Sequence, residues 1–452
     1  MQLKNIIAMK RFAVFGSPII HSFSPQVYAQ LFANNCVYWK YKRILTDEPQ
    51  NVIKFIKEFG LYGANITAPL KQKIIPFLDS ITDDSTRIGA VNTILNHNDK
   101  LLGFNTDWEG VLSSLRNYYL ATESIFDLNN KNILVIGSGN SAASVVYGIK
   151  TFFPDCNLNI FNRHKGKAKK LAERFKVNYL AAESIFDLNN KNTMFSLEKY
   201  DIIIITIPNP RAYLADVVFS KNSVLFFANY TDLDYFNKLK KQNKKIILGN
   251  EWLKEQAISA SEYYFGYDGY CKKVELKISD IKKGLNELKN KNIVLTGFSG
   301  AGKTFIGNKI AKHFGRPFFD LDNMIEKYFN DTIANIFINE GEDAFRKIET
   351  KLLSGIKEKR CVISLGAGAI TNDNNLKYIN SGFVIYLHAD LETSLSRIKI
   401  SEHPILANKT QKEINELYEK RKYIYFDNSD IIVESNNNNI KNIIKEVGYC
   451  HC

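Results

Sequence analysis

The sequence contains a glycine-rich segment, 297-GFSGAGKT-304, that fits the GxxxxGK[ST] pattern of a triphosphate-binding loop in full. In such a loop the backbone amides surround phosphate oxygens, a lysine neutralises the β- and γ-phosphates, and a hydroxyl group binds Mg²⁺. These roles fall here on Lys303 and Thr304. The glycines that let the backbone approach phosphate are Gly297, Gly300 and Gly302. The loop predicts ATP and Mg²⁺ as cofactors of a phosphoryl transfer.

A second glycine turn, 137-GSGNSA-142, follows an apolar run earlier in the chain. Gly137 and Gly139 permit a tight turn in which backbone N–H groups approach a pyrophosphate at a helix N-terminus, and Ala142 takes the third small position. A GxGxxA pattern alone is a weak signal. Together, the two turns predict a bifunctional enzyme that uses a dinucleotide for hydride transfer and a triphosphate as phosphoryl donor.

The charge that follows the second strand of the predicted dinucleotide domain distinguishes NAD from NADP. An NAD-binding fold usually presents Asp or Glu to the ribose 2′-hydroxyl about 20 residues past the glycines, and that carboxylate would repel a 2′-phosphate. This chain has 162-NRHKGKAKK-170, which contains no acid. We expect Asn162, Arg163 and Lys165 to bind the phosphate, so the predicted cofactor is NADP(H). The alternative is that these are ordinary basic residues of a helix.

Composition restricts the class of protein. A chain of 452 residues exceeds what one hydrophobic core usually serves and predicts about two to four domains. No apolar run approaches the roughly 18 residues of a membrane span, and the N-terminus lacks a signal-peptide core, so we expect a cytoplasmic protein without a membrane partner. The net charge of +13 comes from lysines spread along the chain, which favours compositional drift over a nucleic-acid partner.

Elements that could position these residues can be read from the pattern of apolar runs. Short β-rich runs alternate with helical patterns over residues 11–108, as in an α/β domain. From about residue 133 the runs NILVIG, LNIFN and DIIIITIP indicate a doubly wound, Rossmann-like domain. A new strand, NIVLTG, then begins a compact P-loop kinase α/β domain with a parallel sheet. The predicted domains are 1–108 with 252–275 for substrate binding, 109–251 for NADP binding, 276–289 as a linker, and 290–452 for the kinase.

One segment is duplicated. YLATESIFDLNNKN at 119–132 recurs as YLAAESIFDLNNKN at 179–192, with one difference. Two copies of this length are too few and too short for a repeat fold, so we interpret them as a recent duplication or an error in the sequence.

Four motifs precede the dinucleotide turn: 16-GSPIIHSFSP-25, 63-GANITAPLK-71, 89-GAVNT-93 and 103-GFNTDWEG-110. In this order they resemble shikimate 5-dehydrogenase, and the resemblance extends from residue 11 to about residue 272. A small polyhydroxylated carboxylate needs hydroxyl and amide partners in a polar pocket. The residues expected to supply them are Ser22, Ser24, Thr67, Asn92, Asn105 and Gln256, with Ser22 and Ser24 on the carboxylate.

The resemblance also implies a catalytic pair, Lys71 and Asp107. A ketone that accepts hydride develops negative charge on its oxygen, so a cationic proton donor beside that oxygen lowers the barrier. We expect Lys71 to be that donor and Asp107 to orient it. Outside this motif context the same residues would be interpreted as a solvated lysine and a helix-capping aspartate.

Residues 290–440 resemble shikimate kinase, on the strength of the phosphate loop, FFDLD at 318–322, GEDAFRKIE at 341–349, GAG at 366–368 and RKYIYFD at 421–427. We expect Asp320 and Asp322 to lie on alternate residues at a strand end, so that their side chains diverge. By resemblance, Asp320 would hold a water bound to Mg²⁺, as part of the metal site, and Asp322 would orient or deprotonate the acceptor hydroxyl. The expected grip on the substrate carboxylate consists of Arg346, Arg421 and the amides of Gly366 to Gly368.

Both resemblances have departures. Near the nicotinamide this chain has 206-TIPNPRA-212 where the dehydrogenase family has a Thr-rich turn, and Trp252 where it has Met. In the kinase lid, 403-HPIL-406 replaces an Arg-Pro-Leu-Leu segment. The cation at the transferring phosphate would then be protonated His403, or else Arg397 or Lys399.

The product of the first implied activity, shikimate, is the substrate of the second. We therefore predict NADPH-dependent reduction of 3-dehydroshikimate followed by ATP-dependent phosphorylation of the 3-hydroxyl of shikimate, in a monomer or homodimer. One alternative is a quinate/shikimate dehydrogenase of catabolic bias, which a carboxylate near Arg163 would have supported. In the second alternative, the kinase half is a catalytically weak binding module. Evidence against it is that four residues are intact: Lys303, Thr304, Asp320 and Asp322.

Overall fold

The structure is a computed structural model that describes residues 9–180, 197–215, 217, 219–242, 245–266, 269–435 and 440–449. The chain forms two compact units. The first comprises the described residues of Met1–Arg11, Phe23–Trp39 and Glu48–Lys282, and the second those of Phe12–Ser22, Lys40–Asp47 and Lys283–Cys452. Most of the second copy of the duplicated segment, 181–192, lies outside the described residues.

The first unit contains a parallel sheet that, over its described residues, has six strands in the order β12-β11-β10-β7-β8-β9. Its central strands are apolar runs that are buried along almost their whole length, as expected for a parallel sheet covered on both faces. The strands are β7 (Asn132–Ile136), β8 (Asn157–Phe161), β9 (Asn178–Leu180), β10 (Ile202–Ile205), β11 (Val224–Phe227) and β12 (Lys245–Ile247). The predicted Rossmann-like sheet is thus confirmed.

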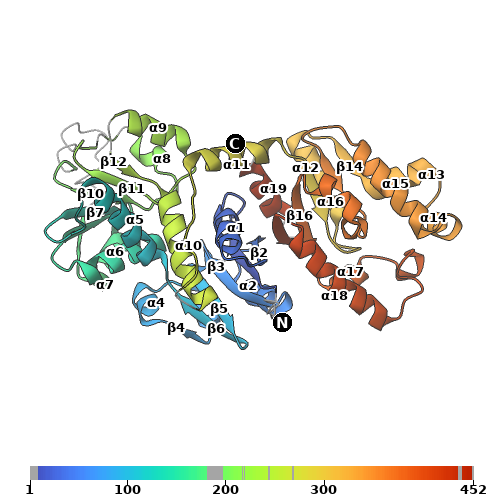
Figure 1. The fold of residues 1–452 in the computed structure, drawn as a ribbon, viewed down its shortest axis with the longest axis horizontal. Helices are drawn as coiled ribbons and strands as arrows, with labels where there is room; N and C mark the ends of the chain where they lie inside the picture. Colours follow the sequence, from blue (N-terminus) through green and yellow to red (C-terminus); the bar gives the residue numbers. More distant parts are fainter. Residues whose placement is uncertain are drawn as a thin grey trace, which may run out of the picture. The chain divides into compact units, whose positions relative to one another are not determined.

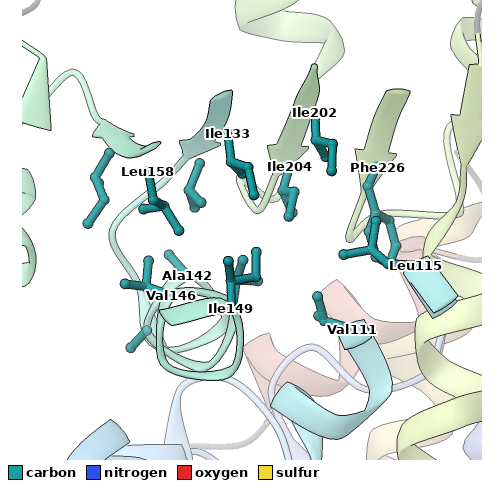
Figure 2. Close-up of a cluster of buried hydrophobic side chains, with 14 of the residues drawn as sticks. Val111, Leu115, Ile133, Ala142, Val146, Ile149, Leu158, Ile202, Ile204 and Phe226 are labelled. Carbon is teal, nitrogen blue, oxygen red and sulfur yellow. The ribbon is translucent and has the colours of Figure 1, made fainter. Parts of the chain in front are cut away.

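Helices cover both faces of this sheet (Figure 1). On one face, Val146 and Ile149 of α6 lie under the central strands that carry Ile133 and Ile204, and Leu115 of α5 lies beside Phe226 (Figure 2). A second apolar cluster, to which α9 contributes, covers the other face. The helices are α5 (Asp107–Thr122), α6 (Asn140–Phe152), α7 (Lys165–Phe175), α8 (Arg211–Leu214) and α9 (Leu233–Lys241).

The rest of the first unit carries the strands β3 (Leu61–Ile66), β5 (Thr93–His97), β6 (Lys100–Phe104) and β4 (Ser80–Ile81), which neighbour one another in that order. β3 pairs with β5, and β5 with β6, in antiparallel fashion. The β5–β6 turn places Asn98 and Asp99 at φ of 52° and 61°, a geometry that these two residue types tolerate in tight hairpins. The accompanying helices are α1 (Ser24–Asn34), α2 (Pro49–Glu58), α3 (Leu70–Lys73), η1 (Ile75–Phe77), α4 (Asp83–Ile88) and α10 (Gly249–Phe265).

The second unit contains strands that neighbour one another in the order β14-β15-β13-β16-β17-β2-β1. The pairs from β14 to β2 are all parallel. Its strands are β1 (Arg11–Gly16), β2 (Lys40–Leu45), β13 (Ile293–Thr296), β14 (Phe318–Asp320), β15 (Val362–Ser364), β16 (Phe383–His388) and β17 (Ile431–Glu434). The predicted parallel sheet of the C-terminal half is present, and β2 extends it through its register with β17.

The helices of the C-terminal half alternate with these strands, as the sequence predicts for a P-loop fold. They are α12 (Lys303–Phe314), α13 (Leu321–Phe329), α14 (Ile333–Asn339), α15 (Gly341–Gly355), η4 (Ala369–Thr371), α16 (Asp373–Ile379), α17 (Leu391–Ser396), η5 (Ile400–Glu402), α18 (Gln411–Asp427) and α19 (Ile440–Tyr449).

The division into compact units falls inside a helix, α11 (Ile278–Asn290), which occupies the predicted linker. The predicted domain boundaries differ from the compact units chiefly because β1 and β2 group with the C-terminal half. The compact units are defined by contacts within the chain and not by function, so the domain boundaries given in the sequence analysis stay a prediction. Among the helices that the structure describes, none is long and apolar enough to cross a membrane.

Candidate active sites

Lys71 and Asp107 meet in the first unit. Lys71 lies on α3, directly after β3, and Asp107 is the first residue of α5. The Nζ of Lys71 lies 2.5 Å from Oδ2 of Asp107, and their side chains are 12% and 8% exposed. A cation held by one carboxylate is suited to deliver a proton to an oxygen that gains charge. The structure therefore assembles the pair that the sequence predicted.

A network of amide side chains orients Asp107. The Nδ2 of Asn92 donates to Oδ1 of Asp107 at 3.0 Å and lies 3.2 Å from Oε1 of Gln256. The backbone N–H of Thr106 donates to Oδ1 of Asn92 at 2.8 Å, which fixes the amide orientation. Asn92 and Gln256 are both buried. The carboxylate is thus oriented by a connected polar network, in which each buried group has a partner.

Gln256 reaches this network because α10 lies close against α5 (Figure 1). A Cβ added to Gly110 of α5 would lie 2.8 Å from Cβ and 2.9 Å from the backbone nitrogen of Gln256. A larger residue at position 110 would push the two helices apart. Gly110 therefore supports the site indirectly, because it lets α10 approach α5 closely. Its place at the end of the GFNTDWEG motif could have indicated this role.

The other predicted substrate residues have separate local roles. Asn105 is buried, donates to the carbonyl of Ala90 at 2.9 Å and accepts from Oγ of Ser144 at 3.3 Å, so it ties the start of α5 to α6. Thr67 follows β3 and is half-buried, and Ser24 is buried as the first residue of α1. Ser22 belongs to the second unit, where its carbonyl accepts two hydrogen bonds from Arg43, at 2.9 and 2.6 Å.

The dinucleotide turn has the geometry that its glycines predict. Gly137 has φ of +127°, and a Cβ there would lie 2.1 Å from Oγ1 of Thr206, so only glycine fits. Gly139 caps α6, and a Cβ at that position would meet nothing within 4 Å. Ala142 is fully buried under the sheet. A closed turn beside an open helix N-terminus fits a pyrophosphate.

The basic turn after β8 is braced by two contacts that sequence reasoning missed. The Nδ2 of Asn162 donates to Oγ of Ser138 in the glycine turn at 2.6 Å. The Nη1 of Arg163 donates to Oη of Tyr213 at 2.9 Å, and its guanidinium lies 4.9 Å from the centroid of that ring. Lys165 begins α7 and is exposed. The donor set is cationic, which suits the 2′-phosphate of NADP.

The triphosphate loop of the second unit is shaped by close backbone approaches. At Gly297 a Cβ would lie 2.5 Å from the carbonyl oxygen of Leu387, and at Gly300 it would lie 2.1 Å from that of Ser394. Both have positive φ, as does Gly302, which caps α12. The loop can therefore be built only with glycines, and its amides converge at a helix N-terminus, where phosphate binds.

Lys303 and Thr304 begin α12 inside this loop. The Nζ of Lys303 is buried and donates to the carbonyls of Gly297 and Phe298, at 3.0 and 3.1 Å. Burial lowers the pKa of Lys303, while Asp322 and Asp320 oppose that shift. The hydroxyl of Thr304 donates to Oδ2 of Asp320 at 2.6 Å. A hydroxyl beside one carboxylate fits Mg²⁺, which binds few protein oxygens and takes its other ligands from water and phosphates.

One detail of the acidic pair differs from the sequence prediction. β14 ends at Asp320, which caps α13, and Asp322 lies in the first turn of that helix instead of on the strand. The divergence of the two side chains comes from this change from strand to helix and not from strand alternation. Burial raises the pKa of Asp322. A carboxylate with a raised pKa that faces a buried lysine is suited to accept a proton from a hydroxyl group.

The predicted carboxylate grip is partly assembled. A Cβ on Gly368 would lie 2.3 Å from Nη2 of Arg346, and Arg421 is buried on α18. Sequence reasoning missed Glu349, which accepts from Nη1 of Arg346 at 3.0 Å with each carboxylate oxygen. It also missed Tyr425, whose hydroxyl donates to the carbonyl of Ala367 at 2.7 Å. Arg346 and Glu349 are three residues apart on one helix, and this spacing could have indicated their contact.

The idea of a protonated lid histidine does not fit the structure. The Nδ1 of His403 accepts from the backbone N–H groups of Ile405 and Leu406, both at 3.3 Å, and its Nε2 lies 2.8 Å from Oγ of Ser299. Burial, and then the charges of Arg421 and Lys303, lower its pKa. These contacts and the lowered pKa disfavour a protonated ring at His403.

Arg397 is the better placed cation. Its Nη1 lies 3.3 Å from the carbonyl oxygen of Gly300 in the phosphate loop, and its Nη2 donates to the carbonyl of Ser435 at 3.0 Å. Of the alternatives for the missing lid arginine, the structure thus favours Arg397.

Three family models match the chain. Residues 14–94 match the shikimate dehydrogenase substrate binding domain, residues 119–221 match shikimate / quinate 5-dehydrogenase, and residues 299–449 match shikimate kinase. Among similar proteins, the shikimate dehydrogenase (NADP(+)) of Nitrosopumilus maritimus is 31% identical over 268 residues, which are 57% of this chain and 94% of the relative. The enzyme of that name from Methanosphaera stadtmanae is 32% identical over 56% of this chain and 90% of its own length.

A solved structure supports the same likeness. The crystal structure of shikimate dehydrogenase from Aquifex aeolicus superposes with a TM-score of 0.50 and 26% sequence identity, over 61% of this chain and 97% of that one. The two dehydrogenase models cover Lys71 and the dinucleotide turn, while the kinase model covers Lys303 and Asp322.

Proposed function

Because the chain belongs to the shikimate dehydrogenase family and carries a shikimate kinase domain after it, we propose that it catalyses two consecutive reactions. The first is the NADPH-dependent reduction of 3-dehydroshikimate to shikimate. The second is the Mg²⁺- and ATP-dependent phosphorylation of shikimate to shikimate 3-phosphate. The observation that carries the proposal is that one chain holds two sets of polar residues, one around Lys71 and one around Lys303. The families that these two parts of the chain match catalyse reactions in which the product of the first is the substrate of the second.

In the reduction, NADPH supplies the hydride when bound. Lys71 donates a proton from Nζ to the carbonyl oxygen of the substrate as that oxygen gains charge. Asp107 holds the ammonium group in place, and Asn92 in turn holds Asp107. Ser22, Ser24 and Thr67 are proposed to bind the carboxylate and hydroxyl groups of the substrate, which would orient the reacting ketone towards Lys71.

In the phosphorylation, ATP supplies the phosphoryl group when bound. The backbone amides of the 297–304 loop and Lys303 would hold its phosphates, and Thr304 and Asp320, which are hydrogen-bonded to each other, would hold Mg²⁺. Asp322 accepts the proton of the 3-hydroxyl of shikimate, a role that its raised pKa favours. Arg346 and Arg421 bind the substrate carboxylate, and Glu349 keeps the guanidinium of Arg346 in position.

The alternative of a catabolic quinate/shikimate dehydrogenase with a weak kinase-like module receives less support. The turn after β8 contains no carboxylate that would favour NAD, and Arg163 is braced on Tyr213 instead. In the kinase half, Lys303 donates to a carbonyl of the phosphate loop and Thr304 donates to Asp320, which supports an active kinase. The cytoplasm as location and a monomer or homodimer as assembly state are kept as proposals from the sequence.

A single assay tests the proposed function. Purified full-length chain is mixed with 3-dehydroshikimate, NADPH and Mg·ATP, and NADPH oxidation is followed together with the formation of shikimate 3-phosphate. We expect both signals to appear in a one-to-one ratio once shikimate reaches its steady level. Oxidation of NADPH without any phosphorylated product would refute the kinase half, and reduction only of NAD⁺ with quinate would favour the alternative.

A further inference from the structure

A buried asparagine of the second unit joins the segments that carry the carboxylate grip of the kinase. Asn375 lies on α16 and is fully buried. Its Nδ2 donates to the carbonyl oxygen of Ala369 at 2.9 Å and to Oε2 of Glu349 at 3.4 Å. Its Oδ1 accepts from Oγ1 of Thr350 at 2.7 Å. One side chain therefore connects α15 and α16 with η4, which begins directly after Gly368.

The partners of Asn375 fix the direction in which its amide faces. The carbonyl oxygen of Ala369 can only accept a hydrogen bond, so it must face the amide nitrogen. The hydroxyl of Thr350 accepts from Nδ2 of Asn372 at 3.3 Å, which leaves its own proton for Oδ1 of Asn375. Leucine and ionised aspartate have similar shapes but supply no donor. The site therefore requires an amide and not only a side chain of this size.

The first contact supports Glu349, which is fully buried. Both of its carboxylate oxygens accept from Nη1 of Arg346 at 3.0 Å. Removing a carboxylate from water is unfavourable unless hydrogen bonds replace its hydration. Burial raises the pKa of Glu349, while Arg346 and the hydrogen bond from Asn375 oppose that shift. Asn375 thus helps Glu349 to stay the charged partner that holds Arg346.

The second contact supports the loop whose amides are proposed to bind the substrate carboxylate. The backbone N–H of Ala369 donates to the carbonyl of Gly366 at 3.1 Å, and the carbonyl of Ala369 accepts from Asn375. A Cβ on Gly366 would lie 3.3 Å from Oε1 of Glu349, and a Cβ on Gly368 would lie 2.3 Å from Nη2 of Arg346. The loop and the guanidinium are thus close neighbours, and Asn375 is bonded to the support of each.

We propose that Asn375 is a positioning residue for shikimate binding by the kinase, which fixes the guanidinium of Arg346 relative to the amides of Gly366 to Gly368. It acts on Arg346 through Glu349 and on the amides through Ala369. The inference rests on the proposed function, which places the substrate carboxylate on these groups. It assigns part of the affinity for an anionic substrate to a buried residue that does not touch that substrate.

The test replaces Asn375 by Leu in the full-length chain. Leucine leaves Glu349 and Ala369 without this donor, so we expect the KM for shikimate to rise about tenfold, because a hydrogen bond to a charged group is lost. The kinase kcat, the KM for ATP and the dehydrogenase kcat/KM should stay within about twofold of the wild-type values. Asn374→Ala, which removes an exposed asparagine from the same helix, is the matched control.

A second ligand separates positioning from a merely structural role. The methyl ester of shikimate has no carboxylate charge, so it depends less on the carboxylate grip. We expect Asn375→Leu to weaken the binding of shikimate about tenfold and that of the ester less than about threefold. Equal losses for both ligands would show a general loosening of the domain and overturn the proposal, and so would an unchanged KM for shikimate.

If Asn375→Leu does not fold, Asn375→Asp replaces it in the same measurements. Ionised aspartate keeps the acceptor for Thr350 and removes the donors toward Glu349 and Ala369. The same outcomes then support or overturn the proposal.

Arg346→Ala separates this inference from the proposed function. If that variant leaves the KM for shikimate unchanged, the carboxylate grip is wrongly assigned and the inference falls with it. If Arg346→Ala raises the KM but the Asn375 variants do not, the proposed function stands and only the role of Asn375 is refuted.

Discussion

At the scale of single residues, the dehydrogenase site depends on a lysine that would be unremarkable elsewhere. Lys71 becomes chemically distinctive because Asp107 holds its ammonium group and because Asn92 and Gln256 hold Asp107. The chain of contacts links α3, α5 and α10. The role of each residue therefore follows from its partners and not from its type.

Replacing Lys71 by Ala should lower the dehydrogenase kcat by on the order of 10² or more, because the proton donor of the transition state is lost. The KM for 3-dehydroshikimate should change far less, and the kinase should be unaffected. Lys73→Ala, on the same short helix, is the matched control. Steady-state kinetics of both activities check this, and a variant that kept more than about a tenth of kcat would show that Lys71 is not the acid.

Replacing Arg163 by Ala should raise the KM for NADPH by about 10- to 100-fold while that for NADH changes little, since a charge-assisted contact to phosphate is lost. Tyr213→Phe should act in the same direction but more weakly, because it removes only the hydroxyl that holds the guanidinium. Lys170→Ala, an exposed position on α7, serves as control. Equal losses for both cofactors would make Arg163 a structural residue.

Glu349 should make stability depend on pH. Burial raises the pKa of Glu349 to about 7, from an ordinary value near 4.5. The folded chain therefore holds a proton that the unfolded chain releases within this window, so the free energy of unfolding falls as pH rises from about 4.5 to 7. Glu349→Gln cannot titrate, and its thermal midpoint should fall less between pH 5 and 8 than that of the wild type.

The pKa shift of Glu349 limits this change in the free energy of unfolding to about 3 kcal/mol. The comparison uses Glu416→Gln, an exposed position on α18, to account for the loss of one glutamate elsewhere in the domain. Identical pH dependence in the wild type and in Glu349→Gln would mean that Glu349 keeps its ordinary pKa in the folded chain.

At the scale of elements, the sequence predicts the scaffold of each site better than the segments that cover it. The apolar runs of β7, β10 and β11 are long enough to indicate buried parallel strands, and the glycine turns follow from backbone geometry at φ values that other residues avoid. The lid around His403 was not predictable in this way, because its electrostatics depend on burial and on Arg421 and Lys303, which approach from other elements.

Arg397 should therefore be the lid cation. Arg397→Ala is expected to lower the kinase kcat at least tenfold, because an arginine near the transferring phosphate stabilises the charge that spreads over its oxygens. His403→Arg should bring no several-fold gain, and the wild-type kcat should show no His403 titration between pH 6.5 and 8, since its pKa is lowered. Lys399→Ala is the control. A large gain from His403→Arg together with a silent Arg397→Ala would restore the histidine hypothesis.

At the scale of the whole molecule, motif order was enough to predict the family and the two activities, while the roles of the site residues stay predictions. Motif residues act through backbone geometry and short sequence separations, which one sequence displays directly. Apart from Arg346 and Glu349, which are neighbours on one helix, the contacts that were missed join distant positions: Arg163 and Tyr213 are 50 residues apart, and Tyr425 and Ala367 are 58 apart. Such pairs depend on the packing of elements, and neither partner has a pattern that names the other.

The central claim is that one chain carries out both reactions in sequence. Its most direct test is the formation of shikimate 3-phosphate from 3-dehydroshikimate, NADPH and Mg·ATP by the purified wild type, by Lys71→Ala and by Lys303→Ala. We predict product only with the wild type, restoration of product in Lys71→Ala when shikimate is added, and continued NADPH oxidation by Lys303→Ala without product. Contrary results would be product from Lys303→Ala, or no product from Lys71→Ala even when shikimate is supplied.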